Sequence, residues 1–203
     1  MTADTPSPKL VAPPRLIERG QRENAQTHRA RVFWLTGPSG AGKSTLAHRV
    51  EQTLFTRGIR NVTVLDGDRI RGGLCSDLGF SAEARHENIR RVAHVARMFL
   101  EQGIICLCAF ISPYADDRAN AARIVGPDDF FEIYISCPQS VCEERDCKGF
   151  YRLAREGVIK NYTGVSAPYE EPVNPHLIIR TNGESVEGCA ERLHGFIVNA
   201  VSL

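Results

Sequence analysis

The sequence predicts an α/β domain with a parallel sheet and helices on both faces. Short apolar runs alternate with helix-length amphipathic segments over most of the 203 residues, as in repeated strand–helix units. One run, residues 104–110 (IICLCAF), is continuously apolar, as a strand buried on both faces requires. A glycine-rich sequence, GPSGAGKST at residues 37–45, joins the first apolar run to the helix expected after it. Together these features favour a single layered domain.

The glycine-rich sequence fits the phosphate-binding pattern G-x-x-x-x-G-K-[ST], and we call residues 37–45 the phosphate loop. Glycines let the backbone turn its N–H groups toward phosphate oxygens, and the next helix adds partial positive charge at its start. In this pattern Lys43 reaches the β- and γ-phosphates, and the Ser44 hydroxyl holds Mg²⁺. The predicted nucleoside triphosphate site consists of Gly37, Pro38, Ser39, Gly40, Ala41, Gly42, Lys43, Ser44 and Thr45.

Composition limits the class of protein. The formal net charge is only +1, so no global charge favours nucleic acid or an anionic membrane as a partner. No apolar run approaches the ~20 residues that a membrane span needs, and the first residues, MTADTPSPKLVAPP, lack the apolar core of a secretory signal. The seven cysteines include no C-x-x-C pair, which argues against a disulfide framework. We therefore expect a cytoplasmic protein.

The start of the chain differs in composition from the rest. Proline and small polar residues predict a flexible N-terminal extension over residues 1–30, and its charged part, residues 15–31, is compatible with a loose helix. The folded domain is expected over residues 31–203.

Each further element follows from its own pattern. Ser81 can cap a long helix whose apolar residues recur at helical spacing, and Gly103 ends it. Ser112 is expected to cap the next helix, with Pro113 in the first turn. The expected strands are residues 32–36, 61–65, 104–110, 131–135 and 177–180. The expected helices are residues 44–55, 82–102, 113–125, 139–145 and 186–201.

A long polar segment, residues 146–175, is rich in Gly, Lys and Arg. Irregular segments of this length inside a compact domain are usually functional lids or disordered, and we call it the lid segment. Ligands of parallel α/β sheets bind beyond the carboxyl ends of the strands. That rule places the phosphate loop, residues 66–68, residues 110–113 and the lid segment on one rim.

Several side chains on this rim suit a second substrate. Asp68 can hold Mg²⁺ through water or take a proton from an acceptor hydroxyl, although Asp-Gly-Asp is also a turn sequence. Arg85 and Asn88 share a helix face, and a guanidinium suits sulfate or phosphate oxygens; a solvated charged face is the alternative. Phe80 can stack on a planar base or pack against the helix start.

Longer blocks of the chain resemble adenosine 5′-phosphosulfate (APS) kinases. The blocks are DGDRIRGGLCSDLGF, ENIRRVAHVA, AFISPY and KGFYRLAREGVIKNYTGVSAPYEEP, which start at residues 66, 87, 109 and 148. Such kinases transfer the γ-phosphate of ATP to the 3′-hydroxyl of APS, giving 3′-phosphoadenosine 5′-phosphosulfate (PAPS). The resemblance implies a P-loop NTPase-type fold, ATP and Mg²⁺ as cofactors, APS as substrate, a homodimer, and ATP sulfurylase as a functional partner.

The resemblance also implies roles by position. Asp68 corresponds to the Mg²⁺-associated carboxylate beside the attacking hydroxyl, so the implied metal residues are Ser44 and Asp68. Ser112 matches a serine assigned in the family as a phosphoserine intermediate, but direct in-line transfer needs only positioning and charge stabilisation. Phe80 and Tyr162 correspond to two aromatics that enclose the acceptor adenine. The implied APS-binding residues are Asp68, Arg71, Phe80, Arg85, Asn88, Ile111, Lys148 and Tyr162.

Three positions depart from the family pattern. Arg69 stands where Asn is usual, Tyr162 replaces Phe, and Cys147 occupies a position often held by Pro. None removes a group that the reaction requires. The alternatives are a kinase of the same fold with another hydroxyl acceptor, and a non-catalytic nucleotide-binding partner of a sulfate-activating complex.

Overall fold

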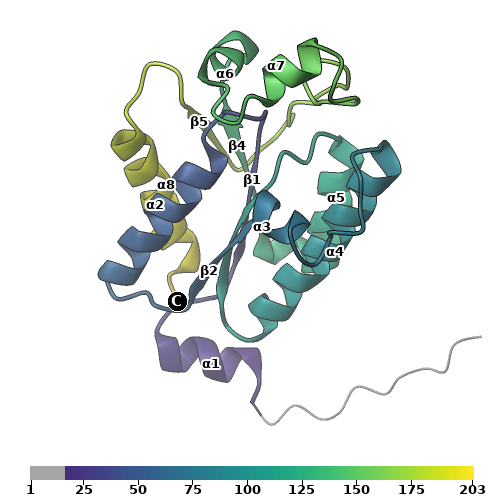
Figure 1. Cartoon of the computed structure of the whole chain (residues 1–203). Helices are drawn as coiled ribbons and strands as arrows, with labels where there is room; N and C mark the ends of the chain where they lie inside the picture. Colours follow the sequence, from purple (N-terminus) through teal and green to yellow (C-terminus); the bar gives the residue numbers. More distant parts are fainter. Residues whose placement is uncertain (1–16) are drawn as a thin grey trace, which may run out of the picture.

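A five-stranded, wholly parallel sheet forms the centre of the molecule (Figure 1). The computed structural model describes residues 17–203. The strands are β1 (Val32–Thr36), β2 (Val62–Asp66), β3 (Ile105–Ala109), β4 (Phe130–Ser136) and β5 (Leu177–Arg180). They lie in the order β2-β3-β1-β4-β5. The predicted parallel α/β fold is thus confirmed, with β1 in the middle.

Helices cover both faces of the sheet (Figure 1). They are α1 (Arg19–Gln26), α2 (Lys43–Thr56), α3 (Gly67–Arg71), α4 (Ala82–Glu101), α5 (Ala115–Val125), α6 (Gln139–Arg145), α7 (Phe150–Arg155) and α8 (Val186–Val201), with a short 3-10 turn at Pro127–Asp129. The α2 and α8 helices pack together on one face, and α4 packs on α5 on the other. Figure 1 shows α6 and α7 beyond the carboxyl ends of the strands.

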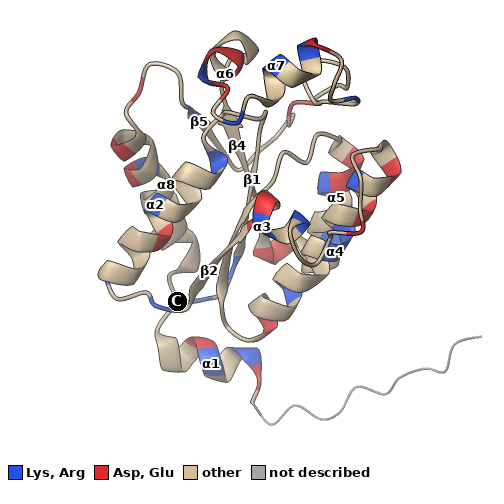
Figure 2. Ribbon diagram, viewed as in Figure 1, with Lys and Arg blue, Asp and Glu red and all other residues tan. Residues whose placement is uncertain are grey.

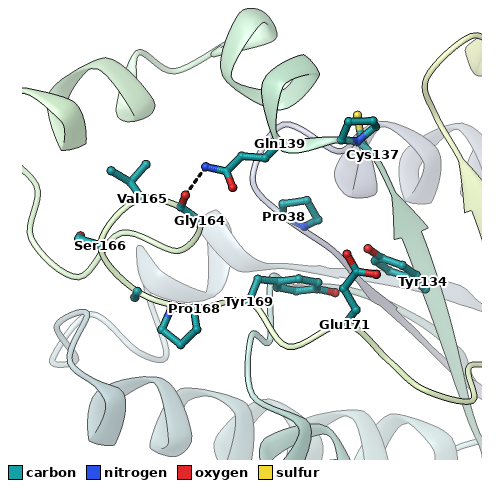
Figure 3. A pocket seen from close by; sticks show the side chains of 12 residues that line it. Pro38, Tyr134, Cys137, Gln139, Gly164, Val165, Ser166, Pro168, Tyr169 and Glu171 are labelled. Atoms are coloured by element: carbon teal, nitrogen blue, oxygen red, sulfur yellow. Dashed lines mark hydrogen bonds between the residues drawn. The ribbon is translucent and has the colours of Figure 1, made fainter.

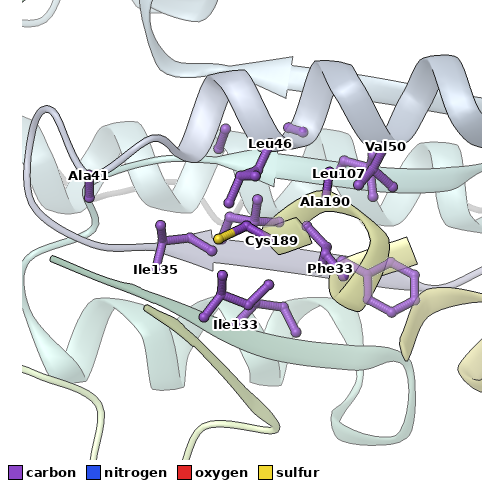
Figure 4. Close-up of a cluster of buried hydrophobic side chains, with 14 of the residues drawn as sticks. Phe33, Ala41, Leu46, Val50, Leu107, Ile133, Ile135, Cys189 and Ala190 are labelled. Atoms are coloured by element: carbon purple, nitrogen blue, oxygen red, sulfur yellow. The ribbon is translucent and has the colours of Figure 1, made fainter. Parts of the chain in front are cut away.

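Successive residues of β1 alternate between two hydrophobic cores because side chains of a strand point to opposite faces. Phe33 and Leu35 belong to the core under α2 and α8, which Figure 4 shows in part. Val32 and Trp34 belong to the core under α4 and α5. All five residues of β1 are buried, which explains why the strand is a continuous apolar run.

The two predicted serine caps have different outcomes. Ser81 is the N-cap of α4, and its hydroxyl accepts a hydrogen bond from the Ala84 N–H at 3.2 Å. The prediction that Ser112 caps a helix is wrong, because α5 starts at Ala115 and Tyr114 is its N-cap. The Ala115 N–H donates instead to a Glu170 carboxylate oxygen at 2.7 Å. Glu170 of the lid segment therefore takes the capping role that was predicted for Ser112.

The first described residues are attached to the body by ion pairs. In α1, Arg19 binds the Asp129 carboxylate at 2.5 Å, and Arg31 binds the same carboxylate. Glu23 accepts a hydrogen bond from the Ala30 N–H at 2.8 Å. The predicted N-terminal extension thus contains an anchored helix, while its residues 1–16 lie outside the described part. Among helices within residues 17–203, none is long and apolar enough to cross a membrane.

Candidate active site

The phosphate loop connects the end of β1 to the start of α2, as its sequence predicts. Gly40 has a φ of +78°, and a Cβ atom added there would lie 2.9 Å from the Cys142 carbonyl oxygen. At Gly37 an added Cβ would lie 2.4 Å from the Ile135 carbonyl oxygen. Any side chain at these two positions would displace backbone, so the loop conformation requires glycine.

Lys43 is the first residue of α2, and its side chain extends back over the phosphate loop. Its Nζ donates hydrogen bonds to the carbonyl oxygens of Gly37 at 2.9 Å and Pro38 at 2.7 Å. The residue is only 8% exposed, and burial lowers the pKa of its amine to about 8. A cation is thus held at the position where phosphate oxygens are expected.

A carboxylate that sequence reasoning did not assign completes this end of the site. Asp66 ends β2, and its Oδ2 accepts a hydrogen bond from the Ser44 hydroxyl at 2.5 Å. Its Oδ1 accepts from the Asp68 N–H at 2.9 Å. Hydroxyl and carboxylate oxygens are donors that suit Mg²⁺, so Ser44 and Asp66 fit the metal that the motif implies. The signal for Asp66 was its place as the last residue of a strand with a buried end.

Asp68 is exposed, unlike Asp66. The Lys148 amine, from the lid segment, forms an ion pair with its carboxylate. Figure 2 shows acidic residues on α3 and basic residues at the start of α2 and between α6 and α7. Two predicted residues that lie 80 positions apart in the sequence are therefore in contact.

The predicted arginines and asparagine form a partly buried group on α3 and α4. Arg85 donates to the Asn161 carbonyl oxygen in the lid segment at 2.8 Å, and Arg71 donates to the Gly79 carbonyl oxygen at 2.9 Å. Burial lowers the pKa of both guanidinium groups. Within the described residues, the buried Asn88 Oδ1 has no hydrogen-bond partner. Such an atom suits a polar ligand because an unpaired buried acceptor is costly.

The two predicted aromatics occupy different environments. Phe80 is 54% exposed, and the Arg71 guanidinium carbon lies 4.5 Å from its ring centroid. Tyr162 is buried, and its ring contacts the ring of Tyr151 edge-to-face at 5.1 Å. No ring contact between Phe80 and Tyr162 occurs in residues 17–203. The structure brings Phe80 to the arginines and places Tyr162 beneath α7.

Ile111 and Ser112 lie in the loop that follows β3. The Ile111 carbonyl oxygen accepts a hydrogen bond from the Thr36 hydroxyl at 2.8 Å. The Ser112 hydroxyl accepts from Trp34 Nε1 at 3.0 Å, and the residue is only 2% exposed. This hydroxyl is thus buried and engaged by the protein.

A cavity of about 560 Å³ lies between Pro38 and the last part of the lid segment (Figure 3). Figure 3 shows Tyr134 and Glu171 close together on one side, and the hydrogen bond from Gln139 to Gly164 on the other. None of the predicted APS-binding residues lines it. This cavity is therefore separate from the group formed by Arg71, Phe80 and Arg85.

Comparison with known proteins gives consistent matches over most of the chain. The model of the family described as adenylylsulphate kinase matches residues 29–180. The adenylyl-sulfate kinase of Acaryochloris marina is 50% identical over 181 residues, which cover 89% of this chain and 88% of the relative. That of Thermodesulfovibrio yellowstonii is 49% identical over 178 residues, which cover 87% and 88%.

Solved structures agree with the sequence matches. The Mycobacterium tuberculosis APS kinase CysC in complex with AMPPNP and APS aligns with a TM-score of 0.80 at 41% identity, covering 84% of this chain and 98% of that one. A hexameric APS kinase from Thiobacillus denitrificans aligns with a TM-score of 0.65 at 30% identity, covering 86% of this chain and 30% of that one. The aligned share of this chain exceeds four-fifths in both.

Proposed function

Since the chain belongs to the adenylylsulphate kinase family, we propose how its residues divide the work of that family's reaction. The enzyme is an adenylyl-sulfate kinase and makes PAPS from APS and ATP. A continuous chain of contacts carries the assignment of residues: it runs from Ser44 through Asp66 to Asp68, and along α3 to Arg71 and Phe80. The phosphate donor and the acceptor therefore meet at α3.

ATP binds along the phosphate loop in this proposal. Lys43 leaves the carbonyl oxygens of Gly37 and Pro38 and turns to the β- and γ-phosphates, which offer it full negative charge. Ser44 and Asp66 would hold Mg²⁺, with Asp68 beside it. When bound, the ion neutralises phosphate oxygens as charge develops on them. The catalytic residues proposed for this chain are Lys43 and Asp68.

APS binds on the other side of α3. Arg71 and Arg85 pair with the phosphosulfate oxygens because a guanidinium presents several donors in a planar fork. The unpartnered Asn88 Oδ1 lies on the same helix as Arg85. Phe80 stacks on one face of the adenine, Tyr162 of the lid segment stacks on the other, and Ile111 lies beside the base.

Transfer occurs directly from ATP to the acceptor. Asp68 orients or deprotonates the 3′-hydroxyl, and Lys148 holds that carboxylate until substrates enter. Closure of the lid segment excludes water, which prevents loss of phosphate to hydrolysis. The Ser112 hydroxyl supports direct transfer, because a phosphoryl group there would replace the proton donated to the Phe110 carbonyl oxygen and would need space around a residue only 2% exposed.

Replacing Asp68 tests the division of labour. The purified enzyme with Mg²⁺ and ATP is assayed with APS, with adenosine 5′-monophosphate and without acceptor, and PAPS is identified by mass. We expect turnover with APS alone, and a loss of about 100-fold or more in Asp68→Ala, on the scale of one general base, with ATP binding retained. Asp77→Ala, which removes an exposed carboxylate paired with Arg91, is the matched control. Near-normal turnover in Asp68→Ala would remove Asp68 from the mechanism.

The subunit number, location and functional partner are further expectations from the family resemblance. We expect a homodimer that acts in the cytoplasm and receives APS from an ATP sulfurylase. A solved relative described as hexameric shows that related kinases assemble. Light scattering on the purified protein measures the subunit number directly.

A further inference from the structure

The carbonyl groups of the phosphate loop are held by side chains. Lys43 Nζ binds the carbonyl oxygens of Gly37 and Pro38. The next three carbonyl oxygens accept from three other side chains: Ser39 from the Tyr151 hydroxyl at 3.0 Å, Gly40 from Arg145 Nη1 at 3.2 Å, and Ala41 from the Thr181 hydroxyl at 2.9 Å. A peptide whose carbonyl is fixed outward has a fixed N–H as well. These contacts therefore stabilise the backbone that must face phosphate oxygens.

ATP binding is expected to break some of these hydrogen bonds and to leave the others in place. Lys43 is needed by the phosphates, so its two bonds are given up on binding. Arg145, Tyr151 and Thr181 come from outside the loop and keep their carbonyl partners. Arg145 is the last residue of α6, and Tyr151 lies in α7, within the lid segment. The conformation of the phosphate loop therefore depends on where α6 and α7 lie.

Tyr151 contacts a residue of the acceptor site as well. Its ring meets the Tyr162 ring edge-to-face, with centroids 5.1 Å apart and an interplanar angle of 83°. The residue is 2% exposed, and its N–H donates to an Asp146 carboxylate oxygen at 3.1 Å. One rigidly placed side chain thus contacts the ATP-binding loop through its hydroxyl and the acceptor aromatic through its ring.

We propose that Tyr151 is a positioning residue that couples the two substrate sites. Its hydroxyl fixes the Ser39 carbonyl for ATP binding, and its ring fixes the Tyr162 ring for APS binding. The second contact rests on the proposed role of Tyr162 in stacking on the acceptor adenine. Occupation of one site then favours the position of Tyr151 that serves the other, and linkage makes this effect reciprocal.

The test separates the hydroxyl from the ring. Dissociation constants of AMPPNP with Mg²⁺ and of APS are measured by calorimetry, each ligand alone and with the other at saturation. In Tyr151→Phe the ring stays and the Ser39 bond is lost. We expect AMPPNP binding to weaken about 2- to 10-fold, the scale of one neutral hydrogen bond. APS binding alone should stay within about twofold, and the coupling factor between the ligands should fall by at least about half.

Two further variants complete the test. Tyr151→Leu also removes the edge-to-face contact, so APS binding should weaken as well, by about 2- to 10-fold on the scale of one aromatic pair. Tyr134→Phe removes the hydroxyl of another buried tyrosine, whose ring stacks on Tyr169, and should leave all constants unchanged. Thermal unfolding shows whether each variant keeps the native fold.

Three outcomes would overturn the proposal. The first is a Tyr151→Phe enzyme with wild-type AMPPNP affinity and wild-type coupling. The second is an equal loss of both ligands in that variant, which indicates general loosening of the lid segment. The third is a wild-type enzyme whose ligands bind independently. A wild type that binds AMPPNP but makes no PAPS would instead contradict the proposed function, and the AMPPNP measurement would still test the Ser39 contact.

Discussion

Lys43 combines a buried position with a need for charge. Its amine lies between two backbone carbonyl oxygens, and burial lowers its pKa to about 8. Phosphate oxygens favour the charged form, so ATP raises this pKa when it binds. The same lowering bears on stability: between about pH 8 and the ordinary lysine range near pH 10 the unfolded chain binds more protons than the folded one. This group's contribution to stability therefore rises with pH across that window.

This conflict predicts proton uptake on nucleotide binding. At about pH 8.5 a large fraction of Lys43 is neutral without ligand, so AMPPNP should take up a proton as it binds. Affinity should fall above about pH 8, approaching tenfold per pH unit. Calorimetry in two buffers with different heats of ionisation measures the uptake, and Lys43→Met is the control without the titrating group. Constant affinity from about pH 7 to 9.5 would show that Lys43 stays charged in the free enzyme.

Residue types at fixed spacing predicted the phosphate loop but not all of its contacts. The motif specifies local backbone, so Lys43 and Ser44 follow from their positions in it. The partner of Ser44 depends on which side chains the fold brings near it, and the sequence analysis assigned Asp68 and gave no role to Asp66, which accepts the Ser44 hydrogen bond. The Ser112 cap failed for a similar reason. Its hydroxyl accepts a hydrogen bond from Trp34 in β1, and a contact between residues so far apart in the sequence cannot be predicted from local pattern.

Most elements were predictable from local pattern, including the short α6 helix and β5, but α7 was not. The α8 helix and the strands β1 and β5 have the predicted bounds, because their apolar spacing records burial directly. The α7 helix has six residues, too few to be stable alone, and Asp146 accepts the N–H groups of Tyr151 and Arg152 at its start. Its existence therefore depends on tertiary contacts.

The attachment of α1 predicts a stability effect at Asp129. Burial alone would raise the pKa of this carboxyl, but the hydrogen bond and charge of Arg19, with Arg31, outweigh it and lower the pKa. Asp129→Ala should therefore reduce the free energy of unfolding by about 2 kcal/mol at neutral pH, on the scale of hydrogen bonds to charged groups. Denaturant unfolding measures the change.

The pH dependence of that effect has a definite sign. A lowered pKa in the folded state stabilises above the ordinary Asp value near 4, and the contribution is lost as pH falls through the folded pKa. The difference between wild type and Asp129→Ala should thus shrink in acid. Asp128→Ala, at an exposed neighbour, is the control. Equal stability of Asp129→Ala and wild type at neutral pH would show that the ion pairs do not anchor α1.

At the scale of the whole molecule, two cores share one sheet and the site lies along its carboxyl edge. The α2–α8 core supports the phosphate loop, and the α4–α5 core supports the arginines. In the proposed binding mode, ATP and APS together contact elements that rest on both cores. Five of the seven cysteines lie in these two cores, Cys75 is buried outside them, and Cys147 is exposed next to Lys148.

Thiol reactivity should follow this division. The reactive species is the thiolate, and burial raises the pKa of Cys106 and of Cys142 to about 12. In native protein, a disulfide reagent with a chromophoric product should modify one thiol rapidly, and all seven cysteines should react in denaturant. Cys147→Ser should abolish the rapid phase, and AMPPNP with APS should slow it in wild type if the lid segment closes. The five thiols that lie in the two cores should react only with global unfolding, because the cores must open to expose them. Rapid reaction of one of these five core thiols in Cys147→Ser, identified by mass after digestion, would show that one core opens without the other.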